Sequence, residues 1–220
     1  METRRAAPAD AAVTRSTAPG ENTRRSRDGK SRDPATAPAS KSAMRTLASL
    51  LLPVLLASAT ASGPLEHGVM LPAVHGELLS GREADLPALA HGHVTLVAFG
   101  FTRGSSKAVE AFGGRFKAAF GADTTYDWLE VPLMGGMARI AKPLITGAMR
   151  GGTPEADRRH VMTAWGVAGD WKPRLEYEDG DWAYLVLLDR DGHVRWRGKG
   201  DFSIPLWQDL EASARALRQP

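Results

Sequence analysis

An almost uninterrupted apolar run, Val94–Phe101, constrains the fold of this chain more than any other segment. A strand with one exposed face alternates apolar and polar side chains, whereas a strand covered on both faces is apolar throughout. A second run of this kind, Tyr184–Leu188, lies near the end of the chain. Two such strands predict a sheet with helices on both of its faces, which is an α/β architecture.

The second buried run continues into a hairpin. A tight turn, Asp189–Gly192, follows it, and His193–Arg197 then alternates as a returning strand. An Asp-Gly pair between two such runs is a strong hairpin signal, so we predict a β-hairpin over Ala183–Gly198. Pro205–Leu217 has one apolar face and is expected to end the chain as a helix.

Between the two buried runs, the spacing of apolar residues predicts first a helix. Its N-cap is expected at Ser105 or Ser106. Its apolar face is formed by Val109, Phe112, Phe116, Ala119 and Phe120.

A strand over Trp128–Met134 follows that helix, and then a helix over Met137–Met149 that Pro143 interrupts. Thr153 and Pro154 predict a further helix that continues to about Trp165. The polar stretch Ala168–Trp182 is expected to be a loop or an irregular arm. Together these elements predict a mixed sheet flanked by helices.

The N-terminal part has a different composition. Residues 1–43 contain no aromatic residue, so we expect them to be disordered, or to be upstream sequence translated from a start codon that precedes the true start at Met44. An organelle transit peptide is the alternative, and Asp10, Glu21, Asp28 and Asp33 weigh against it, because transit peptides are poor in acidic residues. Residues 44–62 have the basic start, short apolar core and small-residue tail of a signal peptide, and this core is well below the roughly 20 residues needed to cross a bilayer.

This pattern predicts that the mature chain is exported to the periplasm and has no stable membrane span. Residues 63–92 are expected to be a lead-in with one or two short extended pieces, and residues 93–220 the folded domain.

Charge and cysteine content exclude two classes of function. Residues 63–220 carry 18 Lys or Arg against 20 Asp or Glu, so the folded part has no basic surface suited to nucleic acid. The chain contains no cysteine. Thiol–disulfide exchange needs a thiolate, so redox chemistry of that kind is excluded.

Two resemblances depend on particular residues. Phe99-Gly-Phe-Thr102 is similar to the phrase before the Cys-x-x-x-Cys loop of the Sco-type copper-delivering assembly proteins of cytochrome oxidase. The positions that match its cysteines are Gly104 and Ala108, and neither side chain can bind a soft metal ion. Copper donation by that mechanism is therefore excluded.

The hairpin resembles that of the thioredoxin-like assembly factor of the mitochondrial F-type ATP synthase, which has bacterial relatives. The similarity covers roughly residues 70–217 and is specific only in the hairpin, at Asp189, Gly192, Val194, Arg195, Trp196, Gly198 and Gly200. It implies a thioredoxin-like fold without redox cysteines, a role in assembling the membrane sector of the synthase, and no enzymatic step. Redox thioredoxins also carry a cis-proline just before the strand that matches Tyr184–Leu188, whereas Gly180–Ala183 contains no proline.

Eight residues are candidates for contact with a protein partner: Arg103, Ser105, Ser106, Lys107, Trp171, Trp182, Arg195 and Trp196. The two serines alternatively cap the helix, or with Arg103 and Lys107 form an anion site at its N-terminus. Trp171 and Trp182 flank an acidic stretch and are expected to be exposed. Arg195 either contacts the partner or forms an ion pair with Asp189 or Asp191.

Metal binding is a weaker alternative. His91 and His93 are separated by one residue, but no third ligand stands at a recognisable spacing, so they are expected to be surface turn residues. Four methionines could form a thioether copper site, but methionine is also an ordinary filler of hydrophobic cores. They are Met134, Met137, Met149 and Met162.

The sequence therefore predicts a non-enzymatic, cofactor-free, thioredoxin-like protein that binds a protein partner and aids assembly of a membrane complex. The alternative is a module that binds a small molecule, an anion or a metal ion with the cysteine-free loop. A third possibility is an enzyme without a cofactor. It would need a convergent acid/base pair, which the sequence does not reveal, and a carboxylate with a perturbed pKa in a cleft would support it.

Overall fold

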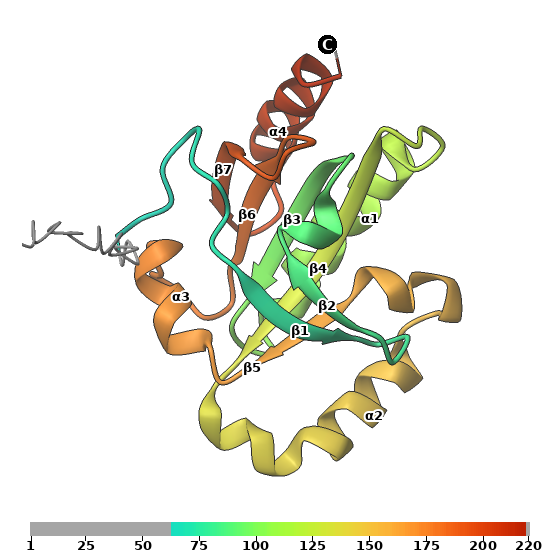
Figure 1. The fold of residues 1–220 in the computed structure, drawn as a ribbon, viewed down its shortest axis with the longest axis vertical. Coiled ribbons are helices and arrows are strands. Elements are labelled where there is room, and N and C mark those ends of the chain that lie inside the picture. Colours follow the sequence, from blue (N-terminus) through green and yellow to red (C-terminus); the bar gives the residue numbers. More distant parts are fainter. Residues whose placement is uncertain (1–62, 219–220) are drawn as a thin grey trace, which may run out of the picture. The chain divides into compact units, whose positions relative to one another are not determined.

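The structure, a computed structural model, describes residues 63–218, and the predicted N-terminal extension and signal peptide lie outside them. Seven strands form one mixed sheet in the order β2-β1-β5-β4-β3-β6-β7 (Figure 1). The β3–β4 and β4–β5 pairs are parallel, and the other pairs are antiparallel. The strands are β1 (Val74–Leu78), β2 (Glu83–Leu86), β3 (Val94–Gly100), β4 (Tyr126–Met134), β5 (Met162–Trp165), β6 (Ala183–Leu188) and β7 (Val194–Gly200).

In the described residues, four α-helices and three short 3-10 helices accompany the strands. The α-helices are α1 (Ser106–Phe120), α2 (Lys142–Gly152), α3 (Ala168–Arg174) and α4 (Ile204–Ala216). The 3-10 helices are η1 (Ala88–Ala90), η2 (Gly136–Ala141) and η3 (Glu155–His160). The predicted mixed sheet flanked by helices is thus confirmed.

The central strand β3 separates two hydrophobic cores, as its continuous apolar sequence predicts. All seven of its residues are buried. Leu96 and Ala98 face the core that α1 and α4 cover. Val97 and Phe99 face the opposite core, which α3 and the segment before β1 cover.

The predicted hairpin and C-terminal helix are present as β6–β7 and α4. The lead-in contributes its two short extended pieces to the sheet as β1 and β2. Pro143 interrupts the helix predicted over 137–149, since η2 ends at Ala141 and α2 has this proline in its first turn. Helix α1 buries the predicted phenylalanines, but Ala119 is exposed, so its inclusion in the apolar face was wrong.

The helix predicted from Thr153 to Trp165 is wrong. The chain makes only the short η3 and then strand β5, whose four residues are all buried. β5 pairs with both β1 and β4, so long-range hydrogen bonds and burial outweigh the local helix-start signal.

The irregular arm predicted over Ala168–Trp182 is also wrong in its first half. Ala168–Arg174 is helix α3. This helix forms because Trp171 stacks on Phe99, with ring centroids 4.9 Å apart, and is only 3% exposed.

Two adjacent glycines in α1 have different surroundings. A Cβ on Gly114 would meet no atom within 4 Å, whereas a Cβ on Gly113 would lie 2.5 Å from Glu130 Oε1 on β4. We expect Gly114→Ala to raise the free energy of unfolding by about 0.5–1 kcal/mol, through helix propensity. Gly113→Ala should gain less, because its methyl group must displace the Glu130 carboxyl group. Urea unfolding of both variants checks this, and an equal gain would show that the carboxyl group moves freely.

Candidate functional site

A cavity of about 720 Å³ lies where β3 and β4 reach their carboxyl ends, beside the first turns of α1. Its wall is largely apolar and includes Val109, Pro132, Met134, Leu144, Ile145 and Met149. Helix α2 supplies part of this wall, although Thr146 is its one buried residue. Figure 1 shows α2 apart from the helices that cover the faces of the sheet. A cavity of this size suits a small molecule or a few side chains of a partner.

The cysteine-free loop forms the polar side of the cavity. Arg103, Ser105 and Ser106 line it, whereas Lys107 is exposed and does not. Ser105 Oγ donates a hydrogen bond to Thr102 O at 2.8 Å, and Ser106 Oγ donates to Arg103 O at 2.8 Å. Ser105 is the N-cap residue of α1, as predicted. Its side chain makes no capping hydrogen bond to the helix. A serine nucleophile needs an adjacent base, and each of these hydroxyl groups instead bonds a backbone carbonyl.

The loop is held by contacts of Thr102, and Asp181 fills the space beside its first matching position, Gly104. Thr102 Oγ1 lies 2.9 Å from Gly180 O and 3.1 Å from Asp181 Oδ1, and it accepts a hydrogen bond from the Gly104 N–H. A Cβ on Gly104 would lie 1.8 Å from Asp181 Oδ1. The loop is therefore built around a glycine at this position, and a cysteine there would require Asp181 to move.

Glu130 on β4 also lines the cavity, although it is not among the site residues predicted from the sequence. Burial raises the pKa of its carboxyl group to about 7, and the negative charges of Glu110 and Asp157 add to this effect. Within residues 63–218, no hydrogen bond or ion pair to this carboxyl group is present. A single acidic residue between Leu129 and Val131 in a predicted strand was the available signal. The cleft carboxylate expected of a cofactor-free enzyme is thus present.

Trp171 and Trp182, which were predicted to be exposed at a partner surface, pack against the hydrophobic core. Trp171 is buried, so its predicted exposure is wrong, and it cannot contact a partner without local unfolding. Trp182 is partly buried and packs against the same core. Burial in this core outweighs the polar character of the surrounding sequence.

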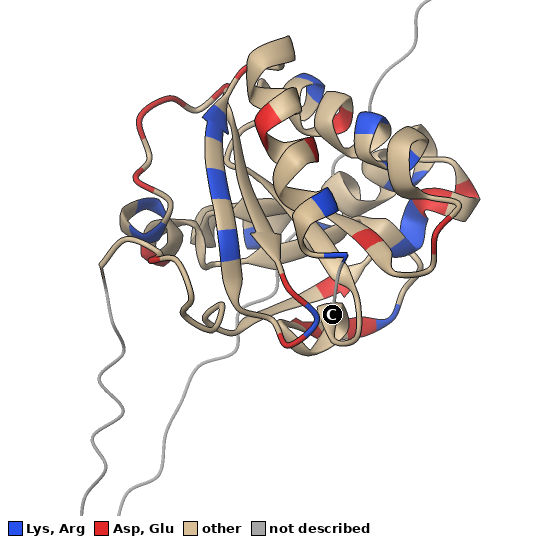
Figure 2. Cartoon of the chain, turned by 90° about the horizontal axis from the view of Figure 1, so that it is seen from above, with Lys and Arg blue, Asp and Glu red and all other residues tan. Residues whose placement is uncertain are grey.

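Basic residues along the edge strand β7 are visible in Figure 2 as blue bands on one strand. Arg195 Nε donates to Asp189 Oδ2 at 2.7 Å, which confirms the ion-pair interpretation. Arg197 pairs with Glu176, and Lys199 Nζ lies 2.6 Å from Glu178 Oε1. These charges join the edge strand to the segment after α3, and charged side chains also disfavour pairing with a foreign strand.

Trp196 lies on the other face of β7. Its Nε1 donates to Asp209 Oδ2 on α4 at 2.8 Å, and its ring packs against the core beneath that helix. Trp196 and Arg195 therefore both have partners within the domain, Trp196 on α4 and Arg195 in the hairpin turn.

The histidines and methionines considered as metal ligands do not come together at one site. His91 is exposed, and His93 Nδ1 is 2.8 Å from Thr124 O. Met162 is fully buried in the core whereas Met137 is 83% exposed, so the four methionines do not share one place. Asp189, Asp191 and His193 lie close together in the hairpin turn. However, Asp189 already accepts hydrogen bonds from two backbone N–H groups and from Arg195.

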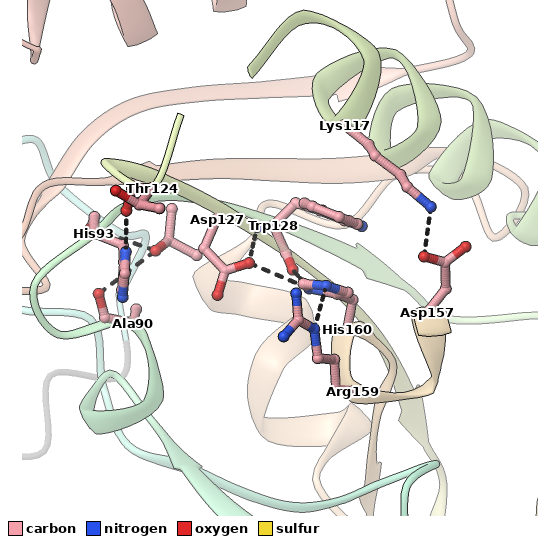
Figure 3. Close-up of polar contacts among 10 residues, drawn as sticks. Ala90, His93, Lys117, Thr124, Asp127, Trp128, Asp157, Arg159 and His160 are labelled. Carbon is pink, nitrogen blue, oxygen red and sulfur yellow. Dashed lines mark hydrogen bonds and ion pairs between the residues drawn. The ribbon is translucent and has the colours of Figure 1, made fainter. Parts of the chain in front are cut away.

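A second polar cluster surrounds His160 on η3 (Figure 3). His160 Nδ1 lies 3.0 Å from Trp128 O and 3.2 Å from Asp127 Oδ1, and its Nε2 accepts a hydrogen bond from Arg159 at 2.9 Å. Burial would raise the pKa of Asp127, but hydrogen bonds from His160 and the Trp128 N–H outweigh it and lower the pKa. Both ring nitrogens are occupied and the residue is 5% exposed, so this cluster anchors η3 to β4 and offers no free base.

No helix within residues 63–218 combines the length and the apolar character that a membrane crossing requires.

Comparisons with known proteins show the fold and not the function. No model of a known family matches the sequence, and no curated protein matches it either. Among solved structures, a protein described as a thiol:disulfide interchange protein DsbE from Chlorobium tepidum has a TM-score of 0.50 at 16% identity, over 70% of this chain and 99% of that chain. BsSco, from the Sco family of cytochrome c oxidase assembly proteins, has a TM-score of 0.50 at 13% identity, over 70% and 96%.

An uncharacterised conserved protein from Geobacillus kaustophilus has a TM-score of 0.51 at 15% identity, over 70% of this chain and 82% of that chain. At such low identity these similarities concern the fold alone. The chain therefore has the thioredoxin-like fold, in a form that carries no cysteine.

Proposed function

We propose that this protein is an exported, non-enzymatic thioredoxin-like protein that binds a partner protein at the cavity beside Phe101–Lys107 and aids assembly of a membrane complex. The observation that carries the proposal is the cavity itself. It lies against the loop that follows β3, its wall is largely apolar, and the loop holds Ser105 and Gly104 in contacts that serve no thiol chemistry.

The neighbouring surface supports binding of a protein. Met137, Ile140 and Leu144, on η2 and α2, are 83%, 83% and 77% exposed. Leu144 lines the cavity, and Met137 and Ile140 lie on η2, which lines it through Ala138. Exposed large apolar side chains on elements that also line an apolar cavity are typical of protein interaction sites. Arg103, Ser105 and Ser106 belong to the proposed contact surface, with Lys107 beside it. Arg195 and Trp196 are more distant in the chain, and their contact with a partner stays a prediction.

The nature of the partner rests on two similarities. BsSco is a member of the Sco family of cytochrome c oxidase assembly proteins, and it shares this fold. The β6–β7 hairpin resembles that of the ATP synthase assembly factor, which makes the membrane sector of that synthase the first partner to test. Export rests on the signal-peptide pattern of residues 44–62.

Site-specific photocrosslinking in cells tests this proposal. A photoreactive residue at Leu144, which lines the cavity and is 77% exposed, should form crosslinks to subunits of a membrane complex. The same residue at Asp191, exposed in the distant hairpin turn, is the matched control. Identical crosslinks from both positions, or soluble background alone from Leu144, would reject the proposed binding site.

A second candidate is an enzyme without a cofactor, and the raised pKa of Glu130 in the cavity favours it. A general acid or base works best when its pKa lies near the operating pH. The serine hydroxyl groups at the loop are bonded to carbonyls, so Glu130 would have to act without them. Anion binding is disfavoured, because Glu110 and Glu130 both line the cavity.

A further inference from the structure

The carboxyl group of Glu130 is the most unusual polar group of the cavity. It projects from β4 toward α1, where Gly113 leaves the space that any other side chain would occupy. A carboxylate in partly desolvated surroundings without a cation is unfavourable, and neither a hydrogen bond nor an ion pair from residues 63–218 relieves it. The packing of α1 against β4 is therefore arranged around an ionisable group that the described domain itself does not neutralise.

The charges around Glu130 make the base of the cavity negative. Glu110 on α1 lines the same cavity, and Asp157 on η3 also acts on Glu130. The Asp157 charge is offset by Lys117 of α1, which forms an ion pair with it. Arg103 is the one basic residue that lines the cavity, and it comes from the opposite, loop side.

The wall of the cavity that η2 and α2 form carries no negative charge. The segment from Gly135 to Gly152, which forms η2 and α2, contains no acidic residue. Two of its three basic residues, Lys142 and Arg150, pair with Glu77 on β1, outside the cavity. The third, Arg139, lies against Gly166 and does not line the cavity. A ligand that fits both parts must be apolar along α2 and carry a positive charge where it reaches Glu130.

We propose that the cavity binds an apolar segment of the partner protein through one lysine or arginine side chain, whose charge pairs with Glu130 and whose stem lies along the apolar wall. This inference deepens the proposed function and rests on it. Lysine and arginine suit the site because their aliphatic stems pack on apolar surface while the charged end reaches a carboxylate. Flanking apolar residues of the segment would cover Met137, Ile140 and Leu144.

The pH dependence of binding follows from this geometry. The cation favours the ionised form of Glu130, so binding should release a proton near pH 7 and should weaken at pH 5.5, where Glu130 is protonated. Glu110, Asp157, Lys117 and Arg103 are the other charged groups near it, and their fields act on the bound cation as well.

Calorimetry on the full chain with two matched peptides tests the proposal. One is an acetylated, amidated seven-residue apolar peptide with a central lysine, and the other carries norleucine in place of the lysine. At pH 8 the lysine peptide should bind about tenfold more tightly, as expected for a charge-assisted hydrogen bond. Glu130→Gln should abolish that difference, whereas Glu83→Gln, an exposed residue on the edge strand β2, should leave it unchanged.

Hexylamine and 1-hexanol form the second arm. Hexylamine has the charge and the apolar stem of a lysine side chain without a peptide backbone, and 1-hexanol has a similar stem without the charge. Binding of the lysine peptide that depends on Glu130 supports the proposal. Selective binding of hexylamine without binding of the lysine peptide would overturn it in favour of a site for small amines. Equal affinity for the charged and neutral probes would overturn it altogether.

Failure of this inference is distinguishable from failure of the proposed function. Crosslinks from Leu144 that persist in the Glu130→Gln variant would retain the partner and its binding site but reject recognition through a cation. Absence of crosslinks in the wild-type background would instead reject the partner role, whatever the peptides do.

Discussion

Replacement of Glu130 by glutamine should make the protein more stable at pH 8 and remove a loss of stability between about pH 4.5 and pH 7. In the folded state the carboxyl group keeps its proton up to about pH 7, whereas the unfolded chain releases it near the ordinary value of 4.5. The folded state therefore binds more protons within this window, and stability must fall as the pH rises through it. Below the window both states are protonated, so the penalty is absent there.

The full shift would correspond to about 3 kcal/mol, and the partial exposure of Glu130 reduces this to about 1–2 kcal/mol. Urea unfolding at half-unit pH intervals from 4.5 to 8 measures it for the wild type and for Glu130→Gln. Glu83→Gln, which removes an exposed carboxylate from β2, should follow the wild-type curve. Parallel wild-type and Glu130→Gln curves across the whole range would show that the carboxyl group is solvated in the folded protein.

The second large effect is expected for Tyr184→Phe. Tyr184 is 1% exposed, and its hydroxyl group donates to Asp179 O at 2.9 Å. The same oxygen accepts hydrogen bonds from the N–H groups of Glu178 and Asp179, at 2.8 and 3.0 Å. Loss of the hydroxyl group leaves three backbone groups without this partner, and we expect a loss of about 2–3 kcal/mol in the free energy of unfolding.

Tyr177→Phe is the matched control. The Tyr177 ring stacks on Tyr184 with centroids 5.9 Å apart, but its hydroxyl group makes no hydrogen bond within the part of the chain that the structure describes. Its removal should cost less than about 0.5 kcal/mol. Hydrogen exchange adds a local readout, because the Glu178 and Asp179 N–H groups should exchange faster only in Tyr184→Phe. Equal exchange in both variants would mean that the segment after α3 is held by other contacts.

The parts of the fold that could be predicted are those in which local pattern and tertiary environment agree. The strand β3 and the β6–β7 hairpin can each be predicted from a few consecutive residues, the apolar run of β3 and the Asp-Gly turn of the hairpin. Gly192 in that turn has φ of 87°, which few other residues adopt readily. Strand β5 could not be predicted in this way, because it is short, follows a helix-start signal, and is defined by pairing with β1 and β4.

The same distinction holds for the candidate site: residues placed by local pattern could be predicted, and residues placed by tertiary contacts could not. The position of the loop follows from the end of β3, so Arg103, Ser105 and Ser106 were found at the cavity. Trp171 was misplaced because helix α3 depends on the contact with Phe99 and not on its own polar sequence. Glu130 was missed because its significance depends on Gly113, seventeen positions earlier in the chain and on another element.

The segment from η2 to α2 forms a wall of the cavity, yet η2 buries no residue and α2 buries only Thr146. The two cores on either side of the sheet draw none of their buried residues from it. Sequence changes in this stretch can therefore alter what the cavity recognises with little effect on whether the domain folds. Exchange of residues 136–152 between proteins of this architecture would then transfer partner choice as a separable unit, and such a protein could acquire new partners without rebuilding its framework.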